Sequence, residues 1–320
     1  MLTDDFGRPV KSMRIQVNTT CNLKCFFCHM EGTPIQMEKL TPEEIERVVE
    51  TASRHGVNKI KFTGGEPLLR PDILEIVKRT RKHITGDISM TTNGFRLPSL
   101  ASKLKEAGLD RVNISMHSID NDGFEFITGT DGLDRAKEAV AAAVSAGFTG
   151  IKVNFVVLRG VNVDQIERMI DFCSLNGATL QLIEYETAKD KLDSENYLKY
   201  HQDLGGLSDD LERRCISKGR NELHSRPVYT IPAAGRTVKV ELVMPMKNAE
   251  FCNNCTRIRL TSTGELKGCL MRSDLNVNIA PLLSPDNGNL LDASFRKAVK
   301  MREPYWTVKD EYQDTLLCND

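Results

Sequence analysis

The chain has 320 residues, of which 40% are hydrophobic and 27% are charged, and its formal net charge is −1 at pH 7. This composition is typical of a soluble globular protein with a large core, and it excludes a bulk charge that would attract nucleic acid or a membrane surface. No apolar run approaches the roughly 18 residues of a membrane span, and residues 1–11 lack the order of a signal peptide, so we expect a cytoplasmic protein.

Residues 13–185 alternate short β-rich runs with amphipathic helical patterns. The predicted strands are Met13–Val17, Lys59–Phe62, Asp87–Thr91, Arg111–Ser115, Ile151–Val157 and Thr179–Glu184. One helix is expected to begin at Thr41, an N-cap residue followed by proline and two acids. A second helix is indicated by an apolar stripe at Leu133, Ala136, Val140 and Val144. Six β–α repeats predict a parallel sheet with right-handed crossovers, and the periodicity allows both a curled, barrel-like sheet and a flat, doubly wound one.

After about Lys189 this alternation ends. Residues 190–219 are charged and have a helical pattern. Two hairpins are then predicted, each around a turn that contains glycine. They pair Val228–Ile231 with Thr237–Val243, and Arg257–Thr261 with Leu266–Cys269. The sequence therefore predicts a smaller C-terminal region that contains β-structure.

Six of the nine cysteines fall in two tight groups, and clustered cysteines in a cytoplasmic protein indicate metal ligands rather than disulfides. The first group is Cys21, Cys25 and Cys28, in the loop after the first predicted strand, where a barrel carries its catalytic loops. Three thiolates can bind three irons of a cubane cluster and leave the fourth iron open. A zinc site with His29 as the fourth ligand is the alternative, but its spacing matches zinc motifs poorly. Cys173 lies on a helical apolar stripe and is predicted to be a core residue.

The second group is Cys252, Cys255 and Cys269. Its spacing allows either a zinc knuckle without a fourth ligand or a second incomplete iron–sulfur cluster, whose open iron could bind a substrate atom. Arg257 and Arg259 lie between these cysteines, two residues apart on a predicted strand, so both point to one face. Paired guanidinium groups suit phosphate ligands.

The spacing Cys-x3-Cys-x2-Cys after a first strand closely resembles the hallmark of the radical S-adenosylmethionine (SAM) superfamily. The segment Thr63-Gly64-Gly65-Glu66-Pro67 resembles that family's motif for the SAM amino group. The resemblance implies a [4Fe–4S] cluster on the first three cysteines, and SAM cleavage to a 5′-deoxyadenosyl radical that abstracts a hydrogen atom. The SAM contacts that it implies are Phe27, Gly65, Glu66 and Ser115.

With the second cysteine group and its Arg-x-Arg, most of the chain resembles the MoaA family, the GTP 3′,8-cyclases of molybdenum cofactor biosynthesis. The resemblance implies a lyase with two [4Fe–4S] clusters, the second on Cys252, Cys255 and Cys269. This lyase would convert GTP to (8S)-3′,8-cyclo-7,8-dihydroguanosine 5′-triphosphate. No catalytic residue beyond the clusters and SAM is expected. The implied GTP contacts are Arg14, Lys61, Thr91, Lys152, Arg257 and Arg259.

We therefore expect an α/β fold, an incomplete (β/α)6 TIM-type barrel whose open side is closed by a smaller, β-containing C-terminal region. Residues 1–190 would form the partial barrel, and residues 191–320 the region with the second cluster and the substrate site. The expected partners are GTP, an electron donor such as ferredoxin or flavodoxin, and a downstream enzyme of the MoaC type. The resemblance leaves room for a homodimer, and we expect no nucleic-acid or membrane partner.

Two departures from the family keep an alternative open. Lys61 stands where the family usually has an arginine, and the chain ends in Cys318-Asn319-Asp320 where many members end in Gly-Gly. The alternative is a related radical SAM enzyme with an auxiliary cluster that acts on a peptide or another small molecule. A third reading is a zinc-binding or scaffold protein without catalytic activity.

Overall fold

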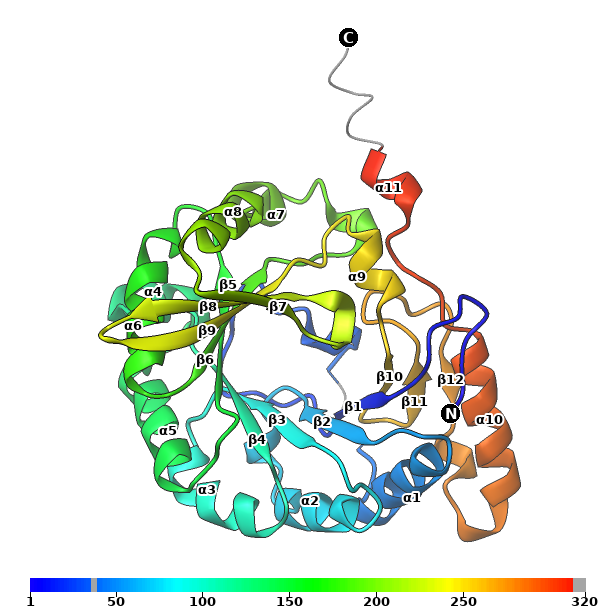
Figure 1. Ribbon diagram of the computed structural model, residues 1–320. Helices are drawn as coiled ribbons and strands as arrows, with labels where there is room; N and C mark the ends of the chain where they lie inside the picture. Colours follow the sequence, from blue (N-terminus) through cyan, green and yellow to red (C-terminus); the bar gives the residue numbers. More distant parts are fainter. Residues whose placement is uncertain (36–38, 313–320) are drawn as a thin grey trace. The chain divides into compact units, whose positions relative to one another are not determined.

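The computed structural model describes residues 1–35 and 39–312, which form two compact units (Figure 1). Unit 1 comprises residues 1–115, 134–151 and 256–303, and unit 2 comprises residues 116–133, 152–255 and 304–312. Each unit is assembled from several chain segments. The boundary expected at residue 190 follows the change of sequence pattern and stays a prediction.

Unit 1 is built around a sheet in the order β12-β11-β10-β1-β2-β3-β4. Strands β10, β1, β2, β3 and β4 run parallel to one another, whereas β11 pairs antiparallel with both β10 and β12. The strands are β1 Ser12–Gln16, β2 Lys59–Thr63, β3 Ile88–Thr92, β4 Arg111–Ser115, β10 Arg257–Leu260, β11 Glu265–Lys267 and β12 Val277–Asn278. All strands predicted in this part of the sequence are confirmed to within one or two residues.

Helices cover one face of this sheet. In Figure 1, α1, α2 and α3 follow one another along β1 to β4. The helices of unit 1 are α1 Pro42–Arg54, α2 Ile73–Arg81, α3 Leu97–Glu106, α5 Leu133–Ser145 and α10 Gly288–Lys300. Successive side chains of a strand point to opposite faces, so only every second one contacts these helices. On β1, Met13 and Ile15 are fully buried, whereas Arg14 between them is half-buried. The opposite face is therefore free to carry polar groups.

Helix α1 begins where the sequence predicts. Thr41 is the N-cap, its hydroxyl accepts the Glu44 backbone N–H, and the Glu44 carboxylate accepts the Thr41 N–H in return. Helix α5 corrects one prediction, because Val144 is 47% exposed whereas Ala143 is fully buried. The buried residues Ala136, Ala139, Val140 and Ala143 are centred on one side of the helix, and Val144 points about 90° away from that direction.

Unit 2 contains strands in the order β5-β6-β9-β8-β7, with β5, β6 and β9 parallel and β9, β8 and β7 antiparallel. The strands are β5 Lys152–Val157, β6 Thr179–Glu184, β7 Ser217–Arg220, β8 Pro227–Ala233 and β9 Arg236–Val243. The helices are α4 Asn121–Thr128, α6 Ile166–Leu175, α7 Glu195–Tyr200, α8 Gly205–Arg214, α9 Ala249–Asn253 and α11 Val308–Tyr312.

Both predicted hairpins are present. Strands β8 and β9 are joined by Ala234 and Gly235, which both have positive φ as a two-residue type I′ turn requires. The helical pattern predicted up to residue 219 is wrong at its end, because Ser217–Arg220 pairs with β8 as a strand. Cys173 is fully buried, as predicted for a core residue.

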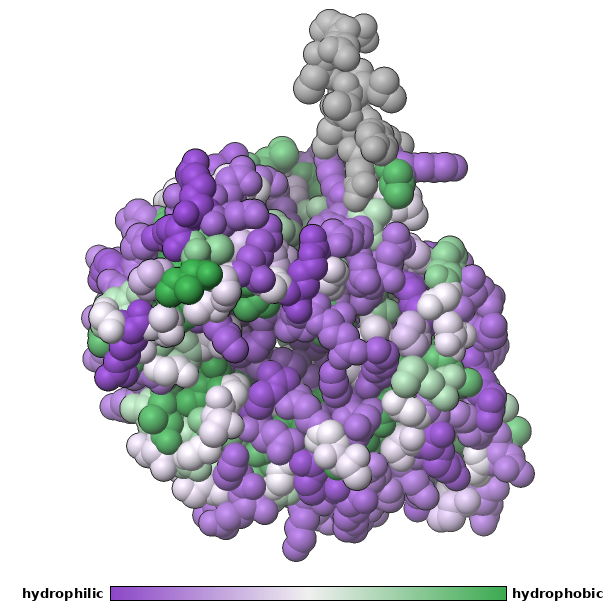
Figure 2. Space-filling view, in the orientation of Figure 1, coloured by the Kyte–Doolittle hydropathy of each residue, from purple (hydrophilic) through white to green (hydrophobic). Residues whose placement is uncertain are grey.

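None of the helices among the described residues is both long and apolar enough to span a membrane. Figure 2 shows hydrophilic side chains over most of the visible face, with apolar residues in small scattered groups.

Candidate active site

The first cysteine group lies in the loop that follows β1, at the carboxyl end of the parallel strands of unit 1. Cys21 and Cys28 are exposed and Cys25 is half-buried. The Leu23 backbone N–H donates to Cys21 Sγ and the Met30 N–H donates to Cys28 Sγ, both at 3.4 Å. Hydrogen bonds of this kind stabilise the charge on thiolates that bind iron.

The chemistry of these thiols fits an iron–sulfur cluster. Burial, together with the neighbouring Cys28 and Cys21 thiols, raises the pKa of Cys25 to about 12, so that thiol needs a cation to ionise. Within residues 1–35 and 39–312, no group of three or more His, Cys, Asp or Glu side chains is placed to hold a metal ion.

The glycines of the second motif are required by close packing. The Gly65 N–H donates to the Asn18 carbonyl at 3.0 Å, and the Glu66 N–H donates to the Thr20 carbonyl at 2.7 Å. A Cβ at Gly64 would lie 2.3 Å from Asn18 Oδ1, and one at Gly65 would lie 2.2 Å from the Thr20 carbonyl oxygen. The motif is therefore packed directly against the residues that lead into Cys21.

Glu66 is only 2% exposed and its carboxylate is held from several sides. It accepts hydrogen bonds from Thr92 Oγ1 at 2.6 Å, the Asn93 N–H at 2.6 Å and the Leu68 N–H at 2.9 Å. Burial raises the pKa of this carboxyl, and the hydrogen bonds oppose that shift. Glu66 is thus positioned by the end of β3, and its contact with SAM stays a prediction.

Asn93 is a site residue that the sequence analysis did not select. Its side-chain amide lies 4.0 Å from Cys21 Sγ and donates to Asn22 Oδ1 at 2.9 Å, so it connects the end of β3 to the cysteine loop. Its place directly after a parallel strand is the signal that could have identified it.

The other two predicted SAM contacts are also in unit 1. Phe27 packs edge-on against Phe26, with ring centroids 5.8 Å apart, and Ser115 is the half-buried last residue of β4. Their roles stay predictions.

Three of the predicted GTP-binding cations form one row on the polar face of the sheet. Arg14 on β1 is in register with Lys61 on β2 and with Arg259 on β10. Side chains at paired positions of neighbouring strands point to the same face. Arg257 lies two residues before Arg259 on β10, so it shares that face. Thr91 also shares it, because it lies two residues after Ser89, which pairs with Lys61. The strand register thus brings together five residues from four strands.

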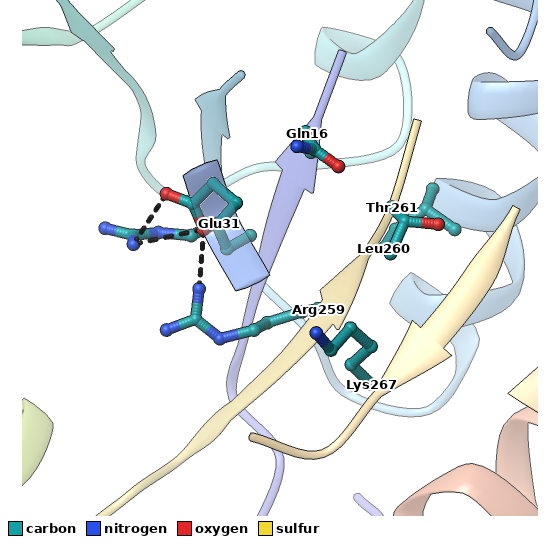
Figure 3. Close-up of a pocket in the computed structure, with 7 residues that line it drawn as sticks. Gln16, Glu31, Arg259, Leu260, Thr261 and Lys267 are labelled. Atoms are coloured by element: carbon teal, nitrogen blue, oxygen red, sulfur yellow. Dashed lines mark hydrogen bonds and ion pairs between the residues drawn. The ribbon is translucent and has the colours of Figure 1, made fainter. Parts of the chain in front are cut away.

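An acidic side chain from the cysteine loop lies against this row (Figure 3). Glu31 accepts hydrogen bonds from Arg259 Nη1 at 2.8 Å, Arg14 Nη1 at 3.1 Å and Thr63 Oγ1 at 3.0 Å. Although burial opposes ionisation, the Arg14 and Arg259 guanidinium groups lower the pKa of Glu31 to about 2. Sequence reasoning missed Glu31, because nothing in its local pattern distinguishes it from a surface acid.

Lys152, the sixth predicted contact, lies on β5 in unit 2. It forms an ion pair with the buried carboxylate of Glu241. Glu241 also pairs with Arg226 at 2.8 Å and accepts a hydrogen bond from Asn221 at 3.1 Å. A buried glutamate therefore accompanies a predicted anion-binding cation here too.

The second cysteine group is divided between the units. Cys252 lies on α9 and Cys255 two residues after its end, both in unit 2, where the Trp306 N–H donates to Cys252 Sγ at 3.3 Å. Cys269 follows β11 in unit 1, after Gly268, whose missing side chain makes room for the buried Arg302. Their ligation of one cluster stays a prediction.

Two family models match the chain. The radical SAM superfamily matches residues 15–173, and "Molybdenum Cofactor Synthesis C" matches residues 178–308. A relative from Thermoplasma volcanium named probable GTP 3′,8-cyclase is 57% identical over 311 residues, which cover 97% of this chain and 94% of the relative. One from Pyrococcus abyssi with the same name is 44% identical, over 96% of this chain and 100% of the relative.

Solved structures share the fold at low sequence identity. The structure of Streptococcus suis SuiB bound to S-adenosylmethionine has a TM-score of 0.65 at 18% identity, over 89% of this chain and 68% of SuiB. Native anSMEcpe with bound AdoMet has a TM-score of 0.57 at 17% identity, over 95% of both chains. The expected α/β class with an incomplete barrel is confirmed, since the sheet is mixed, is not closed and carries additional C-terminal strands.

Proposed function

Because the chain belongs to the radical SAM superfamily, in the family of the GTP 3′,8-cyclases, we propose that it is a lyase of molybdenum cofactor biosynthesis. It would convert GTP to (8S)-3′,8-cyclo-7,8-dihydroguanosine 5′-triphosphate. The observation that carries this proposal is the row of Arg14, Lys61 and Arg259 on the sheet whose first strand leads into the cysteine loop.

When bound, an iron–sulfur cluster would supply the electron that cleaves SAM, and SAM would supply the group that removes hydrogen from the GTP ribose. Cys21, Cys25 and Cys28 would hold this cluster, and their loop is braced by the Gly64-Gly65-Glu66 motif. SAM would be contacted by Phe27, Gly65, Glu66 and Ser115. A second [4Fe–4S] cluster on Cys252, Cys255 and Cys269 belongs to the proposal, as the group that orients the guanine.

The remaining residues would bind and orient the triphosphate. Fixed cations on a strand lose little freedom when a polyanion binds, and guanidinium forks match phosphate oxygens. Thr91 would add a hydroxyl donor. The proposed contacts are Arg14, Lys61, Thr91, Lys152, Arg257 and Arg259.

The proposal includes partners and a compartment. An electron donor such as ferredoxin or flavodoxin would reduce the cluster, and an enzyme of the MoaC type would take the product. We place the reaction in the cytoplasm, where thiols stay reduced. A homodimer is compatible with this assignment.

The direct test is anaerobic incubation of the reconstituted protein with SAM, GTP and a reductant. We expect about eight irons per chain, 5′-deoxyadenosine, and a cyclised GTP product detected by mass spectrometry. Release of 5′-deoxyadenosine without a GTP-derived product would contradict the proposal.

Two variants separate the roles of the cysteine groups. Cys21→Ala is expected to abolish 5′-deoxyadenosine formation. Cys269→Ala is expected to lose about four irons and the cyclised product while still cleaving SAM. If purified wild-type protein held zinc instead of iron, a non-catalytic metal protein would be the better assignment. If a peptide replaced GTP as the compound that stimulates SAM cleavage, the alternative radical SAM enzyme would hold.

A further inference from the structure

Glu31 occupies the place between the two arginines that the proposed function assigns to the triphosphate. Its carboxylate takes one N–H from each guanidinium and a hydroxyl hydrogen from Thr63. The side chains of Arg14, Glu31 and Arg259 are all less than 20% exposed. Glu31 therefore forms ion pairs with both arginines in a site that is largely shielded from water, where hydrogen bonds between charged groups are strong.

The backbone at this position is strained. Met30 and Glu31 both have positive φ, 49° and 55°, and Gly32 follows with 65°. Non-glycine residues avoid this region because Cβ then approaches the neighbouring carbonyl oxygen. Beyond Glu31 the chain is anchored, since the Gly32 carbonyl accepts from Lys267 Nζ at 2.8 Å and Thr33 accepts from Gln16 at 2.7 Å. The ion pairs with the arginines thus hold a conformation that the backbone itself disfavours.

The pocket beside these groups is small while Glu31 lies against the arginines. The pocket lined by Arg14, Gln16, Glu31, Arg259 and Lys267 has a volume of about 10 Å³, enough for roughly one water molecule. Figure 3 shows the Glu31 carboxylate beside the Arg259 guanidinium. A phosphate that takes the two Nη1–H donors now bound to Glu31 would therefore replace this carboxylate.

We propose that the Glu31 carboxylate substitutes for a substrate phosphate on Arg14 and Arg259 and is displaced when a polyphosphate binds there. A polyphosphate offers more charge and more acceptor oxygens to the two guanidinium forks than one carboxylate does. A neutral ligand does not compete for the arginines, so Glu31 weakens the binding of phosphate-bearing ligands alone. The inference rests on the proposed function only in taking GTP as the polyphosphate.

Calorimetry on the reconstituted protein under anaerobic conditions tests this role, with inorganic tripolyphosphate, GTP and guanosine as ligands. Glu31→Gln keeps the shape of the side chain and removes its charge. We expect it to bind tripolyphosphate and GTP about tenfold more tightly than wild type, and guanosine equally well. In an Arg259→Ala background the same substitution should give a smaller gain, because only Arg14 is then freed.

Glu46→Gln is the matched control. Glu46 also pairs with an arginine, Arg79, but on the helical side of unit 1, so its loss should leave all three affinities unchanged. Glu31→Asn provides a second variant, since asparagine tolerates left-handed backbone and guards against misfolding.

Unchanged or weaker tripolyphosphate binding by both Glu31 variants would overturn the inference. That outcome can be separated from failure of the proposed function. Tighter tripolyphosphate binding without any cyclised product would leave the role of Glu31 standing and reject the cyclase. Cyclised product together with unchanged affinities of the Glu31 variants would support the cyclase and reject the role of Glu31.

Discussion

At the scale of single residues, the conformation of the cysteine loop depends on the absence of a Cβ atom at Gly65. Gly65 meets the Thr20 carbonyl so closely that a methyl group has no place to go. The atoms that such a Cβ would meet, in Thr19 and Thr20, all belong to the backbone, which cannot rotate away as a side chain can. The motif that is expected to contact SAM is thus also the structural support of the segment that enters Cys21.

We expect Gly65→Ala to displace this segment and to lower both the iron content and SAM binding of the reconstituted protein severalfold. The physical reason is the 2.2 Å approach of the new Cβ to the Thr20 oxygen. Iron analysis and equilibrium dialysis with SAM would measure the effect. Gly206→Ala is the control, because a Cβ there meets nothing within 4 Å and alanine favours helix α8. Full iron loading of the Gly65 variant would show that the loop adapts.

At the scale of elements, strand register and helix caps place the site. The parallel pairing of β10, β1 and β2 aligns Arg259, Arg14 and Lys61. Helices such as α1 hold that pairing by packing on the apolar face, with Ile45, Val48, Val49 and Ala52 all buried. The start of α1 is set by the reciprocal hydrogen bonds of Thr41 and Glu44.

Thr41→Ala should therefore destabilise the protein by about 1 kcal/mol, because it leaves an N-terminal N–H of α1 without its acceptor. The midpoint of thermal unfolding is expected to fall by about 2 °C. Thr41→Ser keeps the hydroxyl and should unfold close to wild type. Equal midpoints for the alanine and serine variants would show that the cap contributes nothing measurable.

At the scale of the whole molecule, stability depends on buried groups that titrate. His117 in unit 2 is buried, its Nδ1 accepts the Val156 N–H at 3.0 Å, and burial lowers its pKa to about 4. The unfolded chain would protonate this imidazole near its ordinary value of 6.5. Between these two values the unfolded state binds more protons, so stability is complete above about pH 6.5 and declines as the pH falls toward 4.

The expected loss from this residue between pH 6.5 and pH 4 is about 3 kcal/mol. Urea unfolding across that range measures it as a fall in the transition midpoint. His117→Asn can retain the hydrogen bond to Val156 without titrating, so its stability should change less over the same range. Parallel curves for the two proteins would assign the acid sensitivity to other groups.

The sequence by itself determined the local features. Alternation predicted the strands, the cap of α1 was visible in four residues, and the spacing of Cys21, Cys25 and Cys28 indicated the cluster. These properties depend on neighbours in the chain, which a sequence displays directly. Even there a small error remained, since the stripe of α5 was assigned to Val144 when Ala143 faces the core.

Tertiary structure decided which distant groups meet. Glu31 and Arg259 are 228 positions apart, Lys152 and Glu241 are 89 apart, and each pair is set by how strands and loops pack rather than by local pattern. Contacts between remote segments leave no periodic trace, because their geometry arises only when the register of the sheet is formed. The sequence therefore supplied the cations and the cysteines of the proposed site, whereas the fold supplied the carboxylates that hold those cations.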